Sequence, residues 1–126
     1  MPEENSTRTY FFDTHVIVEV LRQNTNYKNY TKHSFVTSKL NLFEVYEILL
    51  KYYSQEIADN FLEEYYPFAR DFNKQVIRKA VLFKKRWHSK LSMTDCIGHT
   101  IANKLGILFL TENIKFKGAE NVEFIR

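Results

Sequence analysis

Hydrophobic residues divide the chain into two alternating kinds of segment. Short runs of β-branched and aromatic residues predict strands at 9–12, 34–37, 107–110 and 122–125, with a further short strand within 67–71. Longer segments, with apolar residues three or four positions apart, predict helices that end near residues 21, 53, 66, 87 and 105. Strands that alternate with helices are typical of an α/β domain built around a mostly parallel sheet.

The region from 92 to 113 contains the clearest boundary signals. Ser92 is a good N-cap, and Asp95 three residues later completes the sequence pattern of a capping box. Gly106 stands where the end of a helix needs a positive φ. The run 107–110 that follows has no polar break, as expected for a parallel strand covered on both faces. On this stretch alone, the simplest interpretation of Asp95 is that it caps its helix.

Helical spacing also assigns the side chains that face the core. In the last helix, Gly98 and Ala102 form a strip of small residues, which lets this helix approach a neighbour closely. The stretch 22–33 has little periodicity and is rich in Asn, Lys and Tyr, so we expect an exposed, basic loop or a frayed helix. The residues expected to face inward are Leu42, Val45, Leu49 and Tyr52; Ile57, Ala58, Phe61, Leu62 and Tyr65; Val76, Ala80, Phe83 and Trp87; and Ile97, Ile101 and Leu105.

Length and composition limit the class of protein. The 126 residues suffice for one domain with a sizeable core, which we place at 9–126, after a polar tail at 1–8 that we expect to be disordered. No apolar run approaches the roughly 20 residues of a membrane span, and the polar, acidic N-terminus is not a signal peptide. The single Cys96 cannot form an internal disulfide, which fits a reducing cytoplasm. The net charge of +3 allows a nucleic-acid partner without requiring one.

Several polar positions stand where the carboxyl ends of parallel strands are expected. Asp13 directly follows the first strand, residues 111–113 follow the fourth, and Glu44 and Asp95 lie in the first turns of two helices. Ligands of open parallel sheets bind beyond the carboxyl ends of the strands, so these groups converge if the helices begin at that edge. Clustered carboxylates repel one another, and Mg²⁺ or Mn²⁺ would remove that conflict and activate water for attack on a phosphate. The arrangement favours metal-dependent phosphodiester hydrolysis, although by pattern alone Glu44 belongs to a solvated helix face.

Two further groups of side chains allow more than one interpretation. Lys84, Lys85 and Arg86 end a helix, where cations compensate the helix dipole, and they equally suit a patch that contacts RNA phosphates. Cys96 and His99 lie one helical turn apart, but zinc usually takes four ligands at recognisable spacing. We therefore expect Cys96 to be a small core residue and His99 to form a hydrogen bond with Asp95.

Four segments resemble the motifs of PIN domains, in the right order and spacing. Residues 10–21 (Tyr-Phe-Phe-Asp-Thr-His-Val-Ile-Val-Glu-Val-Leu) resemble the opening of the family and place Asp13 as its first acid. Residues 38–46 resemble the second motif, with Glu44, and residues 91–102 the third, with Asp95. The last segment, Phe-Leu-Thr-Glu-Asn followed by Phe-Lys-Gly and Asn-Val-Glu-Phe, resembles the C-terminal end of prokaryotic members.

This resemblance implies a three-layer α/β/α sandwich and a ribonuclease like the VapC toxins of VapBC modules. It implies RNA cleavage with Mg²⁺ or Mn²⁺ held by Asp13, Glu44 and Asp95, a homodimer, and an antitoxin protein as partner. Thr111 matches the family's threonine and is expected to support the metal ligands. Many archaeal members carry Gly-Asp where this chain has Glu112-Asn113, so Asn113 would be at most a weak, uncharged additional ligand. Because adjacent residues at a strand end tend to point in opposite directions, Glu112 should point away if Asn113 faces the site.

Two other functions compete with this interpretation. A non-catalytic PIN-like module that binds RNA or a protein partner is favoured by Asn113 and opposed by the three remaining acids. A flavodoxin-like domain that binds a small molecule is opposed by the absence of a Gly-rich phosphate loop in a chain with only 3 glycines.

Overall fold

A five-stranded parallel sheet forms the centre of the molecule. The computed structural model describes residues 7–125. The strands are β1 (Thr9–Phe12), β2 (Ser34–Ser38), β3 (Ala69–Arg70), β4 (Leu108–Thr111) and β5 (Val122–Phe124), in the order β3-β2-β1-β4-β5. Every neighbouring pair is parallel. The expected α/β fold around a parallel sheet is confirmed.

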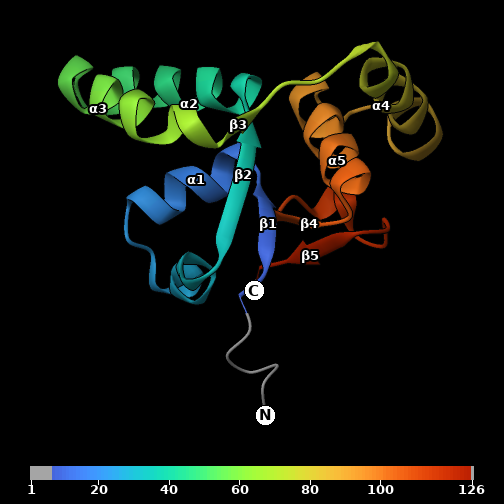
Figure 1. The fold of residues 1–126 in the computed structure, drawn as a ribbon, viewed down its shortest axis with the longest axis horizontal. Coiled ribbons are helices and arrows are strands. Elements are labelled where there is room, and N and C mark those ends of the chain that lie inside the picture. The colour runs from blue at the N-terminus through green and yellow to red at the C-terminus, as the bar shows by residue number, and fades with distance from the viewer. Residues whose placement is uncertain (1–6, 126) are drawn as a thin grey trace.

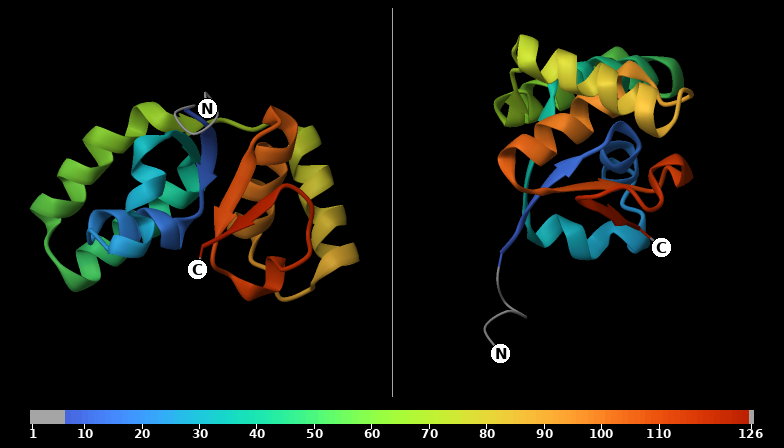
Figure 2. Two further views of the ribbon diagram at one scale, coloured as in Figure 1. Left: turned by 90° about the horizontal axis from the view of Figure 1, so that it is seen from below. Right: turned by 90° about the vertical axis from the view of Figure 1, so that its right-hand side faces the viewer.

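Helices cover both faces of this sheet and give three layers (Figures 1 and 2). The helices are α1 (Thr14–Leu21), α2 (Lys39–Tyr52), α3 (Gln55–Tyr65), α4 (Lys74–Trp87) and α5 (Met93–Leu105), with 3₁₀ turns η2 (Thr25–Lys32), η3 (Tyr66–Phe68) and η4 (Ile114–Phe116). Figure 1 shows α1, α2 and α3 on one side of the strands and α4 and α5 on the other. No helix within residues 7–125 is both long and apolar enough to cross a membrane.

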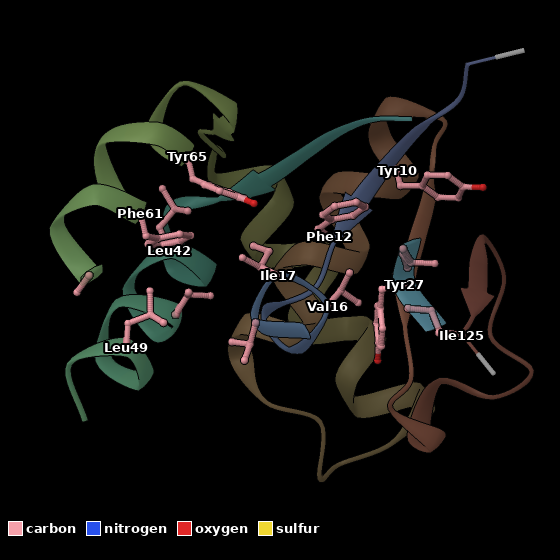
Figure 3. Packing of buried hydrophobic residues seen from close by; sticks show 14 residues of the cluster. Tyr10, Phe12, Val16, Ile17, Tyr27, Leu42, Leu49, Phe61, Tyr65 and Ile125 are labelled. Atoms are coloured by element: carbon pink, nitrogen blue, oxygen red, sulfur yellow. The ribbon is translucent and has the colours of Figure 1, made fainter. Parts of the chain in front are cut away.

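The two faces of β1 contribute to two separate cores. Tyr10 and Phe12 belong to the cluster under α1, α2 and α3, and Figure 3 shows this cluster from close by. Phe11 points to the opposite face and packs with Phe109 and the inner residues of α4 and α5. This alternation follows from the two-residue period of a strand and explains why 10–12 is apolar without a break.

α5 approaches the sheet closely because Gly98 has no side chain. A Cβ atom at this position would lie 2.7 Å from Cε1 of Phe11 and 3.0 Å from Cε1 of Phe109. Both rings are fully buried, so neither has free space to move into. The expected close contact along the small-residue strip is confirmed.

The helix ends follow the signals in the sequence. The backbone N–H of Asp95 donates to Ser92 Oγ at 3.0 Å, and the backbone N–H of Ser92 donates to Asp95 Oδ2 at 3.1 Å, which completes the capping box. Gly106 ends α5 with a φ of 70°. Ser38 and Asn73 cap α2 and α4 as expected.

Four side-chain assignments were wrong. Tyr52 and Leu105 are exposed because each lies in the last turn of a helix, and Ile57 is exposed on the first turn of α3. Trp87 is partly exposed, with its indole N–H donating to the carbonyl of Lys115 at 2.9 Å. The stretch 22–33 is mostly the 3₁₀ turn η2, and Tyr27 within it is buried in the core.

Of the tail expected at 1–8, residues 1–6 lie outside the described part of the chain. Arg8 is held against the start of β2. Its carbonyl accepts from the N–H of Ser34 at 2.9 Å, and its own N–H donates to Nδ1 of His33 at 3.0 Å. Arg8, which was expected to belong to the tail, is therefore fixed by hydrogen bonds.

Candidate functional site

Asp13 lies at the carboxyl end of the central strand, where it also caps α1. Its Oδ1 accepts from the backbone N–H of Thr14 at 2.9 Å, and its Oδ2 accepts from Oγ1 of Thr111 at 2.8 Å. The side chain is only 6% exposed. Burial, together with the negative charges of Asp95 and Glu44, raises its pKa from 3.8 to about 7, although both hydrogen bonds act in the other direction. An acid whose pKa is raised by burial and by other acids is typical of functional sites.

Thr111 orients this carboxylate from the neighbouring strand. It is fully buried at the end of β4, and its hydroxyl also accepts from the N–H of Asn113 at 3.0 Å. Because the hydroxyl accepts one bond, its own proton is directed at Asp13. Thr111 thus holds the carboxylate of Asp13 in place.

Glu44 reaches the site through Thr14 at the start of α1. Glu44 Oε1 accepts from Oγ1 of Thr14 at 2.6 Å, and that same Oγ1 accepts from the side-chain amide of Asn41 at 2.9 Å. Asn41 is fully buried and accepts from Oγ of Ser38 at 2.6 Å. Glu44 therefore does not lie on a purely solvated helix face. Sequence reasoning missed Asn41, whose only signal was an amide next to Leu42 in the apolar stripe.

Asp95 faces the same space from the first turn of α5. After burial, the charge of Asp95 has the largest effect on the pKa of Asp13, and Asp95 lines an open cavity next to Asp13. One of its carboxylate oxygens completes the capping box. The residue therefore both caps its helix and contributes charge to the site.

Asp13 and Asp95 border an open cavity of about 340 Å³ at the carboxyl ends of β1 and β4. It is lined by Asp13, Thr14, His15, Ile48, Asp95, Glu112 and Asn113. Both residues that follow β4 therefore line it. The strand alternation ends at Thr111, where β4 ends, so it does not separate the next two residues.

Glu112 and Asn113 are held in different ways. Glu112 Oε1 lies 3.0 Å from Nε2 of His15, and Oε2 accepts a hydrogen bond from the hydroxyl of Tyr27. Asn113 instead caps η4, its Oδ1 accepting from the N–H of Lys115 at 3.0 Å. Glu112 thus supplies the carboxylate next to the cavity, whereas the amide oxygen of Asn113 already accepts a hydrogen bond from Lys115.

The donor set around the cavity fits a hard divalent cation. Within residues 7–125, no three His, Cys, Asp or Glu side chains already stand at metal-binding separation. The side chains of Asp95, Glu44 and Thr111, which all act on the pKa of Asp13, nevertheless carry oxygen donors of the kind that Mg²⁺ and Mn²⁺ prefer. The raised pKa of Asp13 also indicates that a bound cation would stabilise its ionised carboxylate.

The three cations at the end of α4 do not line this cavity. Arg86 lies over the ring of Phe83 and borders a second cavity of about 340 Å³ between α4 and α5, together with Lys79 and Lys104. Burial and the charge of Asp95 raise the pKa of the Cys96 thiol to about 11, and the nearby Lys84 acts in the opposite direction. Lys84 and Arg86 thus face different sides of the helix.

Cys96 and His99 belong to the core of α5. Cys96 is buried, as expected. His99 does not bond Asp95: its Nε2 lies 2.9 Å from the carbonyl oxygen of Glu120, and its ring stacks on Phe83 with 4.4 Å between centroids. Its side chain is directed at the loop before β5 instead of back along α5.

Comparison with known proteins identifies the fold. No family model and no curated protein matches the sequence significantly. A chain of a toxin–antitoxin complex from Klebsiella pneumoniae matches with a TM-score of 0.75 at 18% identity, covering 90% of this chain and 95% of that chain. A chain of the VapBC2 complex from Rickettsia felis, solved with a DNA fragment from its promoter, matches with a TM-score of 0.72 at 18% identity, covering 94% of this chain and 99% of that chain. A chain of DNA-bound VapBC from Salmonella typhimurium matches with a TM-score of 0.70 at 15% identity, covering 94% and 97%. The PIN-like fold that the resemblance implied is confirmed.

Proposed function

We propose that this chain, which has the fold found in VapBC complexes, is a metal-dependent ribonuclease and the toxin of a toxin–antitoxin pair. One observation carries the proposal. Asp13, buried at the carboxyl end of the central strand, has a pKa raised to about 7 by burial and by the charges of Asp95 and Glu44, next to an open cavity. Acids gathered in this way destabilise the protein unless a ligand with positive charge binds there.

Asp13, Glu44 and Asp95 would hold Mg²⁺ or Mn²⁺, with Thr111 supporting Asp13. A divalent ion bound here would lower the pKa of water and neutralise the charge that develops on a phosphodiester. The protein's own contribution is orientation. Thr111 and the N–H of Thr14 fix both oxygens of Asp13, and Thr14 also fixes Glu44. Fixed acids of this kind lose little freedom when a cation binds.

The partners follow from the same comparison and from the surface. The similar structures are toxin–antitoxin complexes, so we propose an antitoxin protein as partner and a cytoplasmic location. For RNA, we propose contacts with Lys84, Lys85 and Arg86, and the phosphate backbone favours such cations. We further propose a homodimer, because α4 exposes Ile77 and Val81, which are 48% and 59% exposed and one helical turn apart.

Replacement of Asp95 by asparagine tests the activity. Asp95→Asn keeps an oxygen that can accept from the N–H of Ser92, so the capping box and the fold should persist. We expect Mn²⁺-dependent cleavage of a mixed RNA pool by the parent, and a loss of at least about 100-fold in the variant, as is usual when charge stabilisation is removed from such a site. Asp59→Asn is the control, since Asp59 is an exposed acid on α3 that accepts a hydrogen bond from the hydroxyl of Tyr46 on α2. Equal cleavage by Asp95→Asn and the parent would overturn the assignment.

The alternative function is a non-catalytic PIN-like module that binds RNA or protein. It is favoured by Asn113, whose amide brings no charge and caps η4. In that case the parent would bind RNA without cleaving it, with or without Mn²⁺. The same assay therefore separates the two functions.

A further inference from the structure

We infer that Glu112 supplies a fourth carboxylate to the metal site and that Tyr27 and His15 are the residues that position it. This inference rests on the proposed metal-dependent function. Glu112 lies one position before Asn113, where the family pattern has its acid. Tyr27 lies in the stretch 22–33, which the sequence predicted to be an exposed loop or a frayed helix.

The geometry holds both carboxylate oxygens of Glu112 at the cavity. Oε1 lies 3.0 Å from Nε2 of His15, and Oε2 accepts from the hydroxyl of Tyr27. His15 also lies 3.6 Å from Oε2 of Glu19, so it stands between two acids. A carboxylate gripped at both oxygens cannot rotate freely into solvent, although its side chain is 43% exposed.

Tyr27 is a rigid support for this carboxylate. Its side chain is only 2% exposed and belongs to the core cluster that includes Val16 and Ile125 (Figure 3). Hydrogen bonds also hold η2, the segment that carries Tyr27. The backbone N–H of Tyr27 donates to the carbonyl of Asn24 at 3.0 Å, and the side-chain amide of Asn24 donates to Glu19 at 2.9 Å. One polar network therefore joins η2 and α1 to the rim of the cavity.

Asn113 does not compete for the same role. Its Oδ1 accepts from the N–H of Lys115, and its own N–H donates to Thr111. Turning the amide oxygen toward a cation would uncap η4 and still bring no negative charge. Glu112 lines the same cavity and brings a full charge, which a divalent cation favours.

Stability alone does not explain the arrangement. The His15 and Glu112 side chains are 54% and 43% exposed, and exposed ion pairs contribute little to the free energy of folding. Tyr27 is buried, and its hydroxyl donates to Glu112 at the rim of the cavity. Its main effect is therefore to fix the position of that carboxylate. Groups that orient metal ligands in this way strongly affect metal affinity.

The experiment measures Mn²⁺ affinity directly, by calorimetry or by the electron paramagnetic resonance of free Mn²⁺, without RNA. We expect Glu112→Gln and Tyr27→Phe each to raise the Kd for Mn²⁺ by at least about tenfold, since partners of metal ligands typically change affinity by about 10- to 100-fold. The matched controls are Glu123→Gln and Tyr10→Phe. They remove a second tyrosine–glutamate hydrogen bond, 3.4 Å long, that does not line the cavity, and they should leave the Kd unchanged.

Each outcome separates the inference from the function on which it rests. If the parent binds Mn²⁺, Asp95→Asn loses it and Glu112→Gln binds as tightly as the parent, Glu112 is only a surface residue and the inference is overturned. If Glu112→Gln weakens binding but Tyr27→Phe, with an unchanged far-UV spectrum, does not, the positioning role of Tyr27 is overturned. If the parent does not bind Mn²⁺ at all, the proposed metal-dependent function fails first.

Discussion

Replacement of Asp13 by asparagine should stabilise the metal-free protein, and increasingly so as pH rises. Asp13 has a pKa of about 7 in the folded chain and an ordinary value of 3.8. Between these values the folded state binds more protons than the unfolded state, so the stability that depends on this group falls as pH rises. Above pH 7 the full cost is reached, about 4 kcal/mol at roughly 1.4 kcal/mol per pKa unit. Asparagine does not titrate and does not bear this cost.

The variant also loses part of a hydrogen-bond set. Its oxygen can still accept from the N–H of Thr14, but its amide group would meet the hydroxyl of Thr111, which must then turn its proton away. Such a rearrangement costs about 1 to 3 kcal/mol. We therefore expect Asp13→Asn to be more stable than the parent by about 2 kcal/mol at pH 8.5 once this loss is subtracted from the electrostatic gain.

Urea denaturation in the presence of chelator, followed by far-UV circular dichroism, measures this effect. The difference in unfolding free energy between variant and parent should grow by about 2 kcal/mol from pH 5.5 to pH 8.5, because only the parent titrates Asp13 in that range. Asp59→Asn, which removes an exposed acid, should show no such growth. A difference that stays constant with pH, or a variant less stable than the parent at pH 8.5, would refute the electrostatic account of this site.

Two further predictions concern packing and assembly. Gly98→Ala should lower the unfolding free energy by about 1 to 3 kcal/mol, because the new methyl group meets the buried ring of Phe11 at 2.7 Å. Urea denaturation measures this, with Lys104→Ala at an exposed position as the control. A variant more stable than the parent would contradict the tight packing of α5. The protein should sediment as a homodimer at high micromolar concentration and Val81→Asp as a monomer, because Val81 lies on an exposed apolar stripe of α4. A monomeric parent would contradict the second prediction.

Much of the fold was determined by local patterns in the sequence. The Ser92–Asp95 capping box and the left-handed Gly106 depend on atoms within a few residues of one another, so they are the same in almost any context. The strand 9–12 and the acid after it were likewise visible in the sequence. Because parallel strands place their carboxyl ends at one edge, the convergence of Asp13 with Asp95 and Glu44 followed from the order of elements.

Only the tertiary structure decided how the site is supported. The hydrogen bond from Thr111 to Asp13 spans 98 positions of the chain, and the bond from Tyr27 to Glu112 spans 85. Nothing in the local pattern around Tyr27 indicates that its ring is buried or that its hydroxyl meets an acid. The raised pKa of Asp13 has the same origin, since burial and neighbouring charges are properties of the folded environment and not of the residue type. The sequence determined which acids stand at the sheet edge, whereas long-range packing determined which of them are buried, oriented and charged.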